Sequence, residues 1–154
     1  MSAAKLPDWY PAMAATGLAG ALGIELIELT ELRVVATMPV DDRTRQPFGI
    51  LHGGASIALA ETVASFGAFM LIDREKFVAV GQEINGNHLR AVSSGVVTAT
   101  ALPVHVGRTS HVWAVEIRDE AGRLVCLSRC TLAIVERRAA NREPRTADGV
   151  KRET

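Results

Sequence analysis

Glu61 stands inside a run of small and apolar residues, 53–72, that contains no other charged side chain. A carboxylate removed from water is costly unless it has partners or a purpose. If the run is helical, Ser65 lies one turn further on the same side and can hydrogen-bond Glu61 or a water beside it. The pair predicts a carboxylate that attacks a substrate or activates water. The alternatives are a Glu61 that meets an arginine at the surface or at an oligomer interface, and ordinary packing at Ser65.

The segment Leu51-His52-Gly53-Gly54 comes immediately before this run. Paired glycines let a ligand approach the backbone, and the first amides of a helix point outward with a partial positive charge. Such a place can hold an oxyanion, although alone the string is weak evidence for one, and a plain turn into a helix is the alternative. Its spacing from Glu61, about two helical turns, would put an oxyanion site and a carboxylate near one pocket, as acyl transfer requires.

Other polar residues are weaker candidates. Gln46, in a loop with Pro47 and Phe48, can donate a hydrogen bond to a water or a carbonyl. His88 and His105 could act as acid or base, but scattered strand histidines are more often structural. The sequence shows no cluster with metal-ligand spacing, so we expect no metal and no cofactor. It also lacks the serine nucleophile elbow and the phosphate-binding loop with its Gly-Lys pair.

The run 53–72 predicts a long helix, and a helix that is apolar on nearly every side is buried in protein or embedded in lipid. Its length is close to the roughly 20 residues that a membrane span needs. Glu61 at its centre would be costly in a bilayer, however, and the sequence offers no second span. We therefore expect a buried helix and no membrane partner.

The segments with strand patterns are 24–29 and 32–40 before the helix, and 77–89, 95–106, 109–118 and 124–135 after it. Residues 1–20 predict a short helix with an irregular lead-in, and 41–49 a loop. The stretch from Asp119 to Arg123 is the clearest hairpin signal because Asp and Gly tolerate turn conformations. Successive hairpins would give an antiparallel meander that wraps the helix. The expected fold is therefore α+β, the arrangement known as the hotdog.

Two strand segments predict particular buried side chains. Alternation in 109–118 places on one face His111, Trp113, Val115 and Ile117, and at least one face must cover the helix. Cys126 and Cys130 share one face of the last strand and lie roughly 13 Å apart. A disulfide needs α-carbons within about 7 Å, so the two cannot pair within that strand. We expect buried core thiols rather than a reactive or metal site.

Length and composition indicate one globular domain. The chain has 154 residues, 48% hydrophobic and 22% charged, close to the globular average. Its formal net charge of +0 gives no general attraction to nucleic acid or to an anionic membrane, so neither is an expected partner. The first residues lack the basic and apolar pattern of a secretory signal, so a cytoplasmic location is expected. From Glu136 the sequence turns polar, which predicts a single domain over 1–136 and a flexible tail over 137–154.

The stretch from Ala36 to Glu61 resembles the hotdog-fold thioesterases. The residues that carry the resemblance are Ala36-Thr37-Met38-Pro39-Val40, Gln46-Pro47-Phe48-Gly49-Ile50-Leu51-His52-Gly53-Gly54-Ala55-Ser56 and Leu59-Ala60-Glu61. They are most similar to the branch that contains one type of 4-hydroxybenzoyl-coenzyme A thioesterase, the phenylacetate-pathway thioesterases and the 1,4-dihydroxy-2-naphthoyl-coenzyme A thioesterases. The similarity extends from about Gly20 to Val135. The combination of Gln, His-Gly-Gly and a helix Glu is specific for this branch, whereas no single piece is.

The resemblance implies an acyl-coenzyme A thioesterase in which Glu61 is the nucleophile or the general base. It implies that a backbone amide in the region of Gly53 and Gly54 polarises the thioester carbonyl. The residues that would orient the carbonyl, the water or the departing thiolate, or assist the water, are Gln46, His52 and Ser65.

The resemblance also implies where coenzyme A binds and how the chain assembles. Two residues match positions in the pocket and coenzyme site, His88 and Arg90. A turn that would contact the nucleotide end of coenzyme A consists of Gly107, Arg108, Thr109 and Ser110. The phosphates of the nucleotide would be met by Arg137 or Arg138. A solvated rim is the alternative for these arginines. Active sites in this branch lie between subunits, so the implied assembly is a homodimer or a homotetramer made from two dimers.

Two other functions fit part of the pattern. A hotdog hydratase or dehydratase would need an Asp and His pair beside the substrate, whereas the acid here is Glu61 after His-Gly-Gly. A non-catalytic acyl-coenzyme A binding module would need a segment that transmits a signal, and no helix-turn-helix pattern is present. The acyl group stays open, because aromatic substrates follow only from the resemblance. The sequence also leaves open whether the substrate is a coenzyme A thioester or a carrier-protein thioester. It does not decide whether Glu61 acts as a nucleophile or as a general base.

Overall fold

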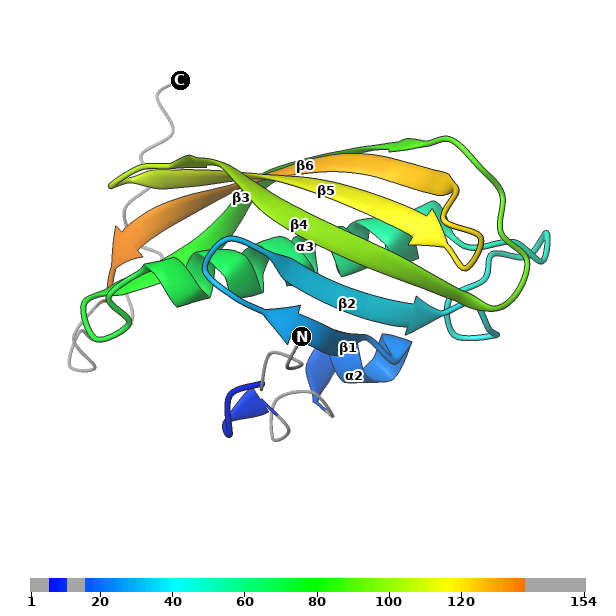
Figure 1. Ribbon diagram of the computed structural model, residues 1–154, viewed down its shortest axis with the longest axis horizontal. Coiled ribbons are helices and arrows are strands. Elements are labelled where there is room, and N and C mark those ends of the chain that lie inside the picture. The colour runs from blue at the N-terminus through cyan, green and yellow to red at the C-terminus, as the bar shows by residue number, and fades with distance from the viewer. Residues whose placement is uncertain (1–5, 11–15, 138–154) are drawn as a thin grey trace, which may run out of the picture.

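In the computed structural model, which describes residues 6–10 and 16–137, one six-stranded antiparallel sheet curves over a single long helix (Figure 1). The strands are β1 (Glu25–Leu29), β2 (Val34–Pro39), β3 (Phe77–His88), β4 (Val96–Val106), β5 (Ser110–Asp119) and β6 (Leu124–Glu136). The helices are α2 (Gly17–Leu22) and α3 (Gly53–Leu71). This arrangement confirms the predicted α+β fold with a sheet wrapped around a central helix. Residues 1–5 and 11–15 of the predicted N-terminal stretch, and residues 138–154 of the predicted tail, lie outside the described residues.

The strand order β1-β2-β4-β5-β6-β3 shows that the expected meander was wrong at one point. The hairpins β1–β2, β4–β5 and β5–β6 are present, and Asp119 N donates to Arg123 O in the last turn. β3, however, pairs along its length with β6, because β2 and β5 already occupy both edges of β4. The connection 89–95 is anchored beside the helix start, where Val92 O accepts from Leu51 N. It carries the chain past that end of the sheet, and β3 is left as a free edge.

α3 lies against the concave face of the sheet and contacts every strand. Its fully buried side chains are Leu59, Val63 and the alanines Ala60, Ala64 and Ala68. By length and composition alone α3 could cross a membrane. Its packing inside the sheet accounts for the same apolar composition, because small residues let the strands approach the helix closely.

The predicted alternation in β5 and the predicted thiols are confirmed. The face of β5 that is buried against the core carries His111, Trp113, Val115 and Ile117. Cys126 and Cys130 are free and fully buried. Burial raises the pKa of Cys130 to about 12, with further contributions from the carboxylates of Glu61 and Glu83. Both thiols are therefore buried and protonated at neutral pH. The negative charge of Glu61 also raises the pKa of the Cys130 thiol.

At Gly67 the ring of Trp113, from β5, packs directly on the backbone of α3. A Cβ at this position would collide with the indole ring of Trp113. We expect Gly67→Ala to lower the free energy of unfolding by about 1–3 kcal/mol, because overpacking outweighs a gain of up to about 1 kcal/mol in helix propensity. Urea denaturation measures the change. In a Trp113→Leu background the same substitution should cost much less, and an equal cost in both backgrounds would exclude the ring as the cause.

Candidate active site

Glu61 and Ser65 line an open cavity of about 680 Å³ on the side of α3. The helix supplies most of the wall, Ala79 of β3 and Leu18 of α2 complete it, and Gly54 lies at the end nearest the helix start. We call this space the Glu61 cavity. Its volume lies in the range of about 300–1,000 Å³ that is typical of small-molecule sites. The predicted proximity of Glu61 and Ser65 is therefore present.

The Glu61 carboxylate is half-buried and lies against the backbone of β3. A Cβ at Gly81 would collide with Glu61 Oε1, so the glycine makes room for the carboxylate. Within the described residues no arginine or lysine forms an ion pair with Glu61. Among the described residues, Glu61 therefore does not form the structural ion pair that was the alternative explanation for its position. The carboxylate is left facing the cavity, where a substrate or a water can reach it.

His52 caps the start of α3. Its Nδ1 accepts a hydrogen bond from Gly54 N at 2.8 Å, and its carbonyl oxygen accepts from Ala55 N and Ser56 N. The Gly54 amide is therefore occupied. Of the first-turn amides in the described part of the chain, the one with no hydrogen-bond acceptor is that of Gly53. An oxyanion at the helix start would thus be met by Gly53 N–H.

A second cavity, of about 340 Å³, opens at the helix start on the side of Gly53. Its wall brings together four predicted site residues, namely Gln46, Gly53, His88 and Arg90. The imidazole of His88 lies over Gly53, so that a Cβ there would stand only 2.8 Å from His88 Nε2. We call this space the Gln46 cavity. It combines an amide donor, a carboxamide, an imidazole and a guanidinium, a set that suits the polar end of an anionic substrate.

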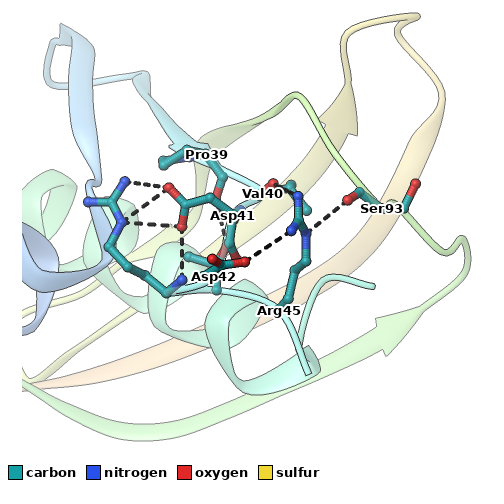
Figure 2. Close-up of polar contacts among 8 residues, drawn as sticks. Pro39, Val40, Asp41, Asp42, Arg45 and Ser93 are labelled. Carbon is teal, nitrogen blue, oxygen red and sulfur yellow. Dashed lines mark hydrogen bonds and ion pairs between the residues drawn. The ribbon is translucent and has the colours of Figure 1, made fainter. Parts of the chain in front are cut away.

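The loop before α3 fixes the position of Gln46. Figure 2 shows the Arg45 guanidinium bridging separate parts of the chain: Nε donates to Ser93 O at 2.9 Å and Nη2 to Val40 O at 3.1 Å. Gln46 N donates to Ile50 O at 2.8 Å, which closes the loop on itself. Gln46 therefore lies between two fixed points, the Arg45 side chain that precedes it and its own backbone hydrogen bond to Ile50 O.

The remaining predicted coenzyme A residues lie elsewhere in the single chain. The turn from Gly107 to Ser110 joins β4 to β5 at the end of the sheet that covers the C-terminus of α3 (Figure 1). Arg137 is at the same end, where its backbone N donates to Lys76 O just after the helix. Arg138 lies outside the described residues. Within one chain, therefore, the length of α3 lies between this group and the residues of the Gln46 cavity, namely Gln46, Gly53, His88 and Arg90.

Residues 48–126 match the family model described as Thioesterase superfamily. The chain belongs to this superfamily. The resemblance drawn from residues 36–61 is thereby confirmed, and the protein is a thioester hydrolase with the hotdog fold.

Individual relatives cover most of this thioesterase. ComA2 of Bacillus subtilis, an esterase by name, is 60% identical over 117 residues, which are 76% of this chain and 93% of ComA2. The 1,4-dihydroxy-2-naphthoyl-CoA hydrolase of Escherichia coli is 46% identical over 124 residues, 80% of this chain and 90% of the relative. A crystal structure of a mutant of thioesterase PA1618 from Pseudomonas aeruginosa has a TM-score of 0.81 and 39% identity, and covers 88% of this chain and 99% of that chain.

Two residues beside the site of the thioesterase were missed from sequence. Gly81 makes room for Glu61, and an isolated glycine inside a strand is a known sign of close approach, so this one could have been found. Arg45, in the loop before α3, was not among the predicted site residues. The backbone oxygens that it binds come from segments far apart in the sequence, and no local pattern indicates them.

His111 of the thioesterase is buried beneath the turn between β4 and β5. Burial lowers the pKa of His111 below its usual 6.5, nearby His105 lowers it further, and a hydrogen bond with the Gly107 backbone acts in the opposite direction. The unfolded chain therefore binds a proton at a higher pH than the folded chain. The free energy of unfolding should fall as the pH drops below about 6.5, by at most about 1.4 kcal/mol per pH unit.

Urea denaturation at pH 7.5 and pH 5 tests this expectation. The native protein should be less stable at pH 5, and His111→Leu should reduce that difference because leucine does not titrate. His105→Gln should reduce the difference only in part, because it removes the influence of His105 on the pKa of His111 and leaves the burial of His111 in place. The carboxylates whose pKa is lowered, such as Asp41 beside Arg43, act only at still lower pH. An equal pH effect in native protein and His111→Leu would exclude His111 as its source.

Proposed function

We propose that this enzyme hydrolyses aryl-coenzyme A thioesters to the free acid and coenzyme A, with Glu61 as the reacting carboxylate. The observation that carries the proposal is a half-buried Glu61, without an ion pair in the described chain, facing an open cavity. The wall of that cavity continues into the aromatic rings of Phe66 and Phe69. The Escherichia coli relative, named for hydrolysis of a naphthoyl thioester, supports an aromatic acyl group.

In the proposed reaction Glu61 either attacks the thioester carbonyl carbon or takes a proton from a water that attacks it. Gly53 N–H and the Gln46 carboxamide stabilise the oxyanion, and the C–S bond then breaks with departure of the coenzyme A thiolate. Direct attack gives an anhydride that water must open. A single turnover in oxygen-18 water that labels the Glu61 carboxylate would establish direct attack, because water then opens the anhydride at the Glu61 carbon, whereas base catalysis sends the water oxygen only to the free acid.

The reacting groups support a site shared between two copies of the chain. Glu61 and Gly53 line different cavities, and about 12 Å of helix axis lies between them. One thioester carbonyl cannot easily contact both in a single chain. A second copy that brings its Gln46 cavity to the Glu61 cavity would complete the site.

The free β3 edge is the surface that we propose for this pairing. β3 has 12 residues and is largely exposed, with Val80 49% exposed, whereas the opposite edge strand β1 has only 5 residues. A long unprotected edge is a template for another strand. Two-fold pairing of β3 edges would run the two molecules in opposite directions. The turn 107–110 and Arg137 of one copy would then approach the helix start of the other copy. This arrangement supports a coenzyme A site built from both copies. Two such dimers would form the tetramer implied by the resemblance.

Thiol release tests the proposed reaction. We would compare benzoyl-, 2-naphthoyl- and decanoyl-coenzyme A with the native protein and expect the aryl thioesters to have the larger kcat/KM. A preference for the fatty thioester would contradict the aryl substrate class. Absence of thiol release from all three would contradict hydrolysis of coenzyme A thioesters.

Mixing two impaired variants tests the shared site. After joint refolding of Glu61→Gln and Gln46→Ala chains, half of the dimers are mixed and each holds one intact site, so about a quarter of the native activity should return. If each site lay within one chain, the mixture would stay at the activity of its parents. Each variant refolded alone is the control.

A further inference from the structure

Trp9 packs behind two aromatic side chains that line the Glu61 cavity. Its ring stacks on Phe66 with centroids 6.2 Å apart and planes 20° apart, and it meets Phe69 edge to face at 5.4 Å and 73°. The guanidinium carbon of Arg74 lies 5.0 Å from the Phe69 ring centre. Trp9 is therefore in contact with both rings at once, while it is not itself part of the cavity wall.

The two phenylalanines mark distances along the helix from the reacting carboxylate. Phe66 follows Glu61 by five residues and Phe69 by eight, which corresponds to about 8 Å and about 12 Å of helix axis. An acyl group that extends from Glu61 toward the helix C-terminus meets Phe66 first and Phe69 after it. The opposite direction leads to Gly54 and the helix start, where the polar Gln46 cavity opens.

We propose that Trp9 sets the depth of the acyl pocket by holding Phe66 and Phe69 in place, so that residues 6–10 select aromatic acyl groups by length. This inference rests on the proposed function. Leu18 of α2 lines the same cavity and is 66% exposed, so the N-terminal part of the chain contributes to the pocket both directly and from behind. Trp9 is a positioning residue, because it acts on the substrate through the two phenylalanine rings.

Tyr10 provides a matched control on the same segment. Its hydroxyl oxygen accepts a hydrogen bond from Leu26 N at 2.7 Å, and its ring meets Phe66 edge to face at 5.9 Å. Tyr10→Phe keeps the ring and removes the anchor to β1. It should lower thermal stability without changing the pocket wall, which is the effect expected of a purely structural contact.

The test measures selectivity, because a general loss of stability would change all substrates alike. We would determine kcat and KM of native protein, Trp9→Ala, Trp9→Phe and Tyr10→Phe with benzoyl-, 2-naphthoyl- and biphenyl-4-carbonyl-coenzyme A. Trp9→Ala should raise the ratio of kcat/KM for the biphenyl over the benzoyl thioester by about tenfold or more, mainly through a lower KM for the longer acyl group. Trp9→Phe and Tyr10→Phe should keep the native ratio.

A change by the same factor for all three thioesters, or an unchanged ratio, would overturn the role of Trp9 and leave the proposed reaction intact. If Trp9→Ala does not fold, Trp9→Leu, which keeps an apolar side chain of shorter reach, should shift the ratio in the same direction, and a native ratio there would overturn the inference. Native protein that releases no thiol from any of the three would remove the proposed function and the inference with it.

Discussion

Glu61→Gln should reduce kcat for an aryl-coenzyme A thioester by about 10²–10⁴-fold while the substrate still binds. Glutamine keeps the size of the side chain and its place against Gly81. It can neither attack a carbonyl carbon nor accept a proton from water. KM should change little, because the carboxylate is proposed to act on the transition state rather than on substrate binding.

Steady-state thiol release measures kcat and KM, and Glu75→Gln is the matched control. Glu75 is exposed in the connection after α3, so its substitution makes the same change in net charge away from the cavity. Urea denaturation of both variants separates activity from folding. A Glu61→Gln protein with native kcat would mean that the carboxylate is structural.

The second large loss of kcat is expected on substitution of Gly81, a residue that would not touch the substrate. An alanine Cβ would collide with Glu61 Oε1, and the carboxylate at the end of a flexible side chain would move away. A displacement of about 1 Å at a reacting group can reduce turnover by about 100-fold. We therefore expect Gly81→Ala to lose about this factor in kcat with little change in the free energy of unfolding.

Gly86→Ala on the same strand is the contrasting variant. A Cβ at Gly86 would collide with Ile57 Cδ1 and approach Cys126 Sγ, so apolar packing rather than the carboxylate would be disturbed. It should lower stability more than Gly81→Ala and activity less. If Gly81→Ala turns over substrate at the native rate, the position of Glu61 seen here is not the one that reacts.

Local periodicity explains why the centre of the site could be predicted from sequence. The spacing of Glu61 and Ser65 within a single helix follows from 3.6 residues per turn, and the apolar composition of 53–72 requires burial. The alternation in β5 likewise identified the residues that cover α3. These features depend on neighbours in the chain, and the structure agrees with them.

Pairing choices and side-chain directions were beyond reach of the sequence. The segment that became β3 has an ordinary strand pattern, and its partner was decided by the occupied edges of β4 and by the anchoring of 89–95 at the helix start. Sequence spacing also could not show that Gly53 and Gly54 line different cavities, since a cap by the side chain of His52 decides which amide is free.

The cap at the start of α3 also fixes the tautomer of His52. Because Nδ1 accepts the hydrogen bond from Gly54 N, that nitrogen carries no proton, and the proton of the neutral ring is on Nε2. The exposed side of the imidazole is therefore a donor. In this state His52 can orient an oxygen of a substrate or a water, but it cannot serve as a base through Nδ1 without uncapping the helix.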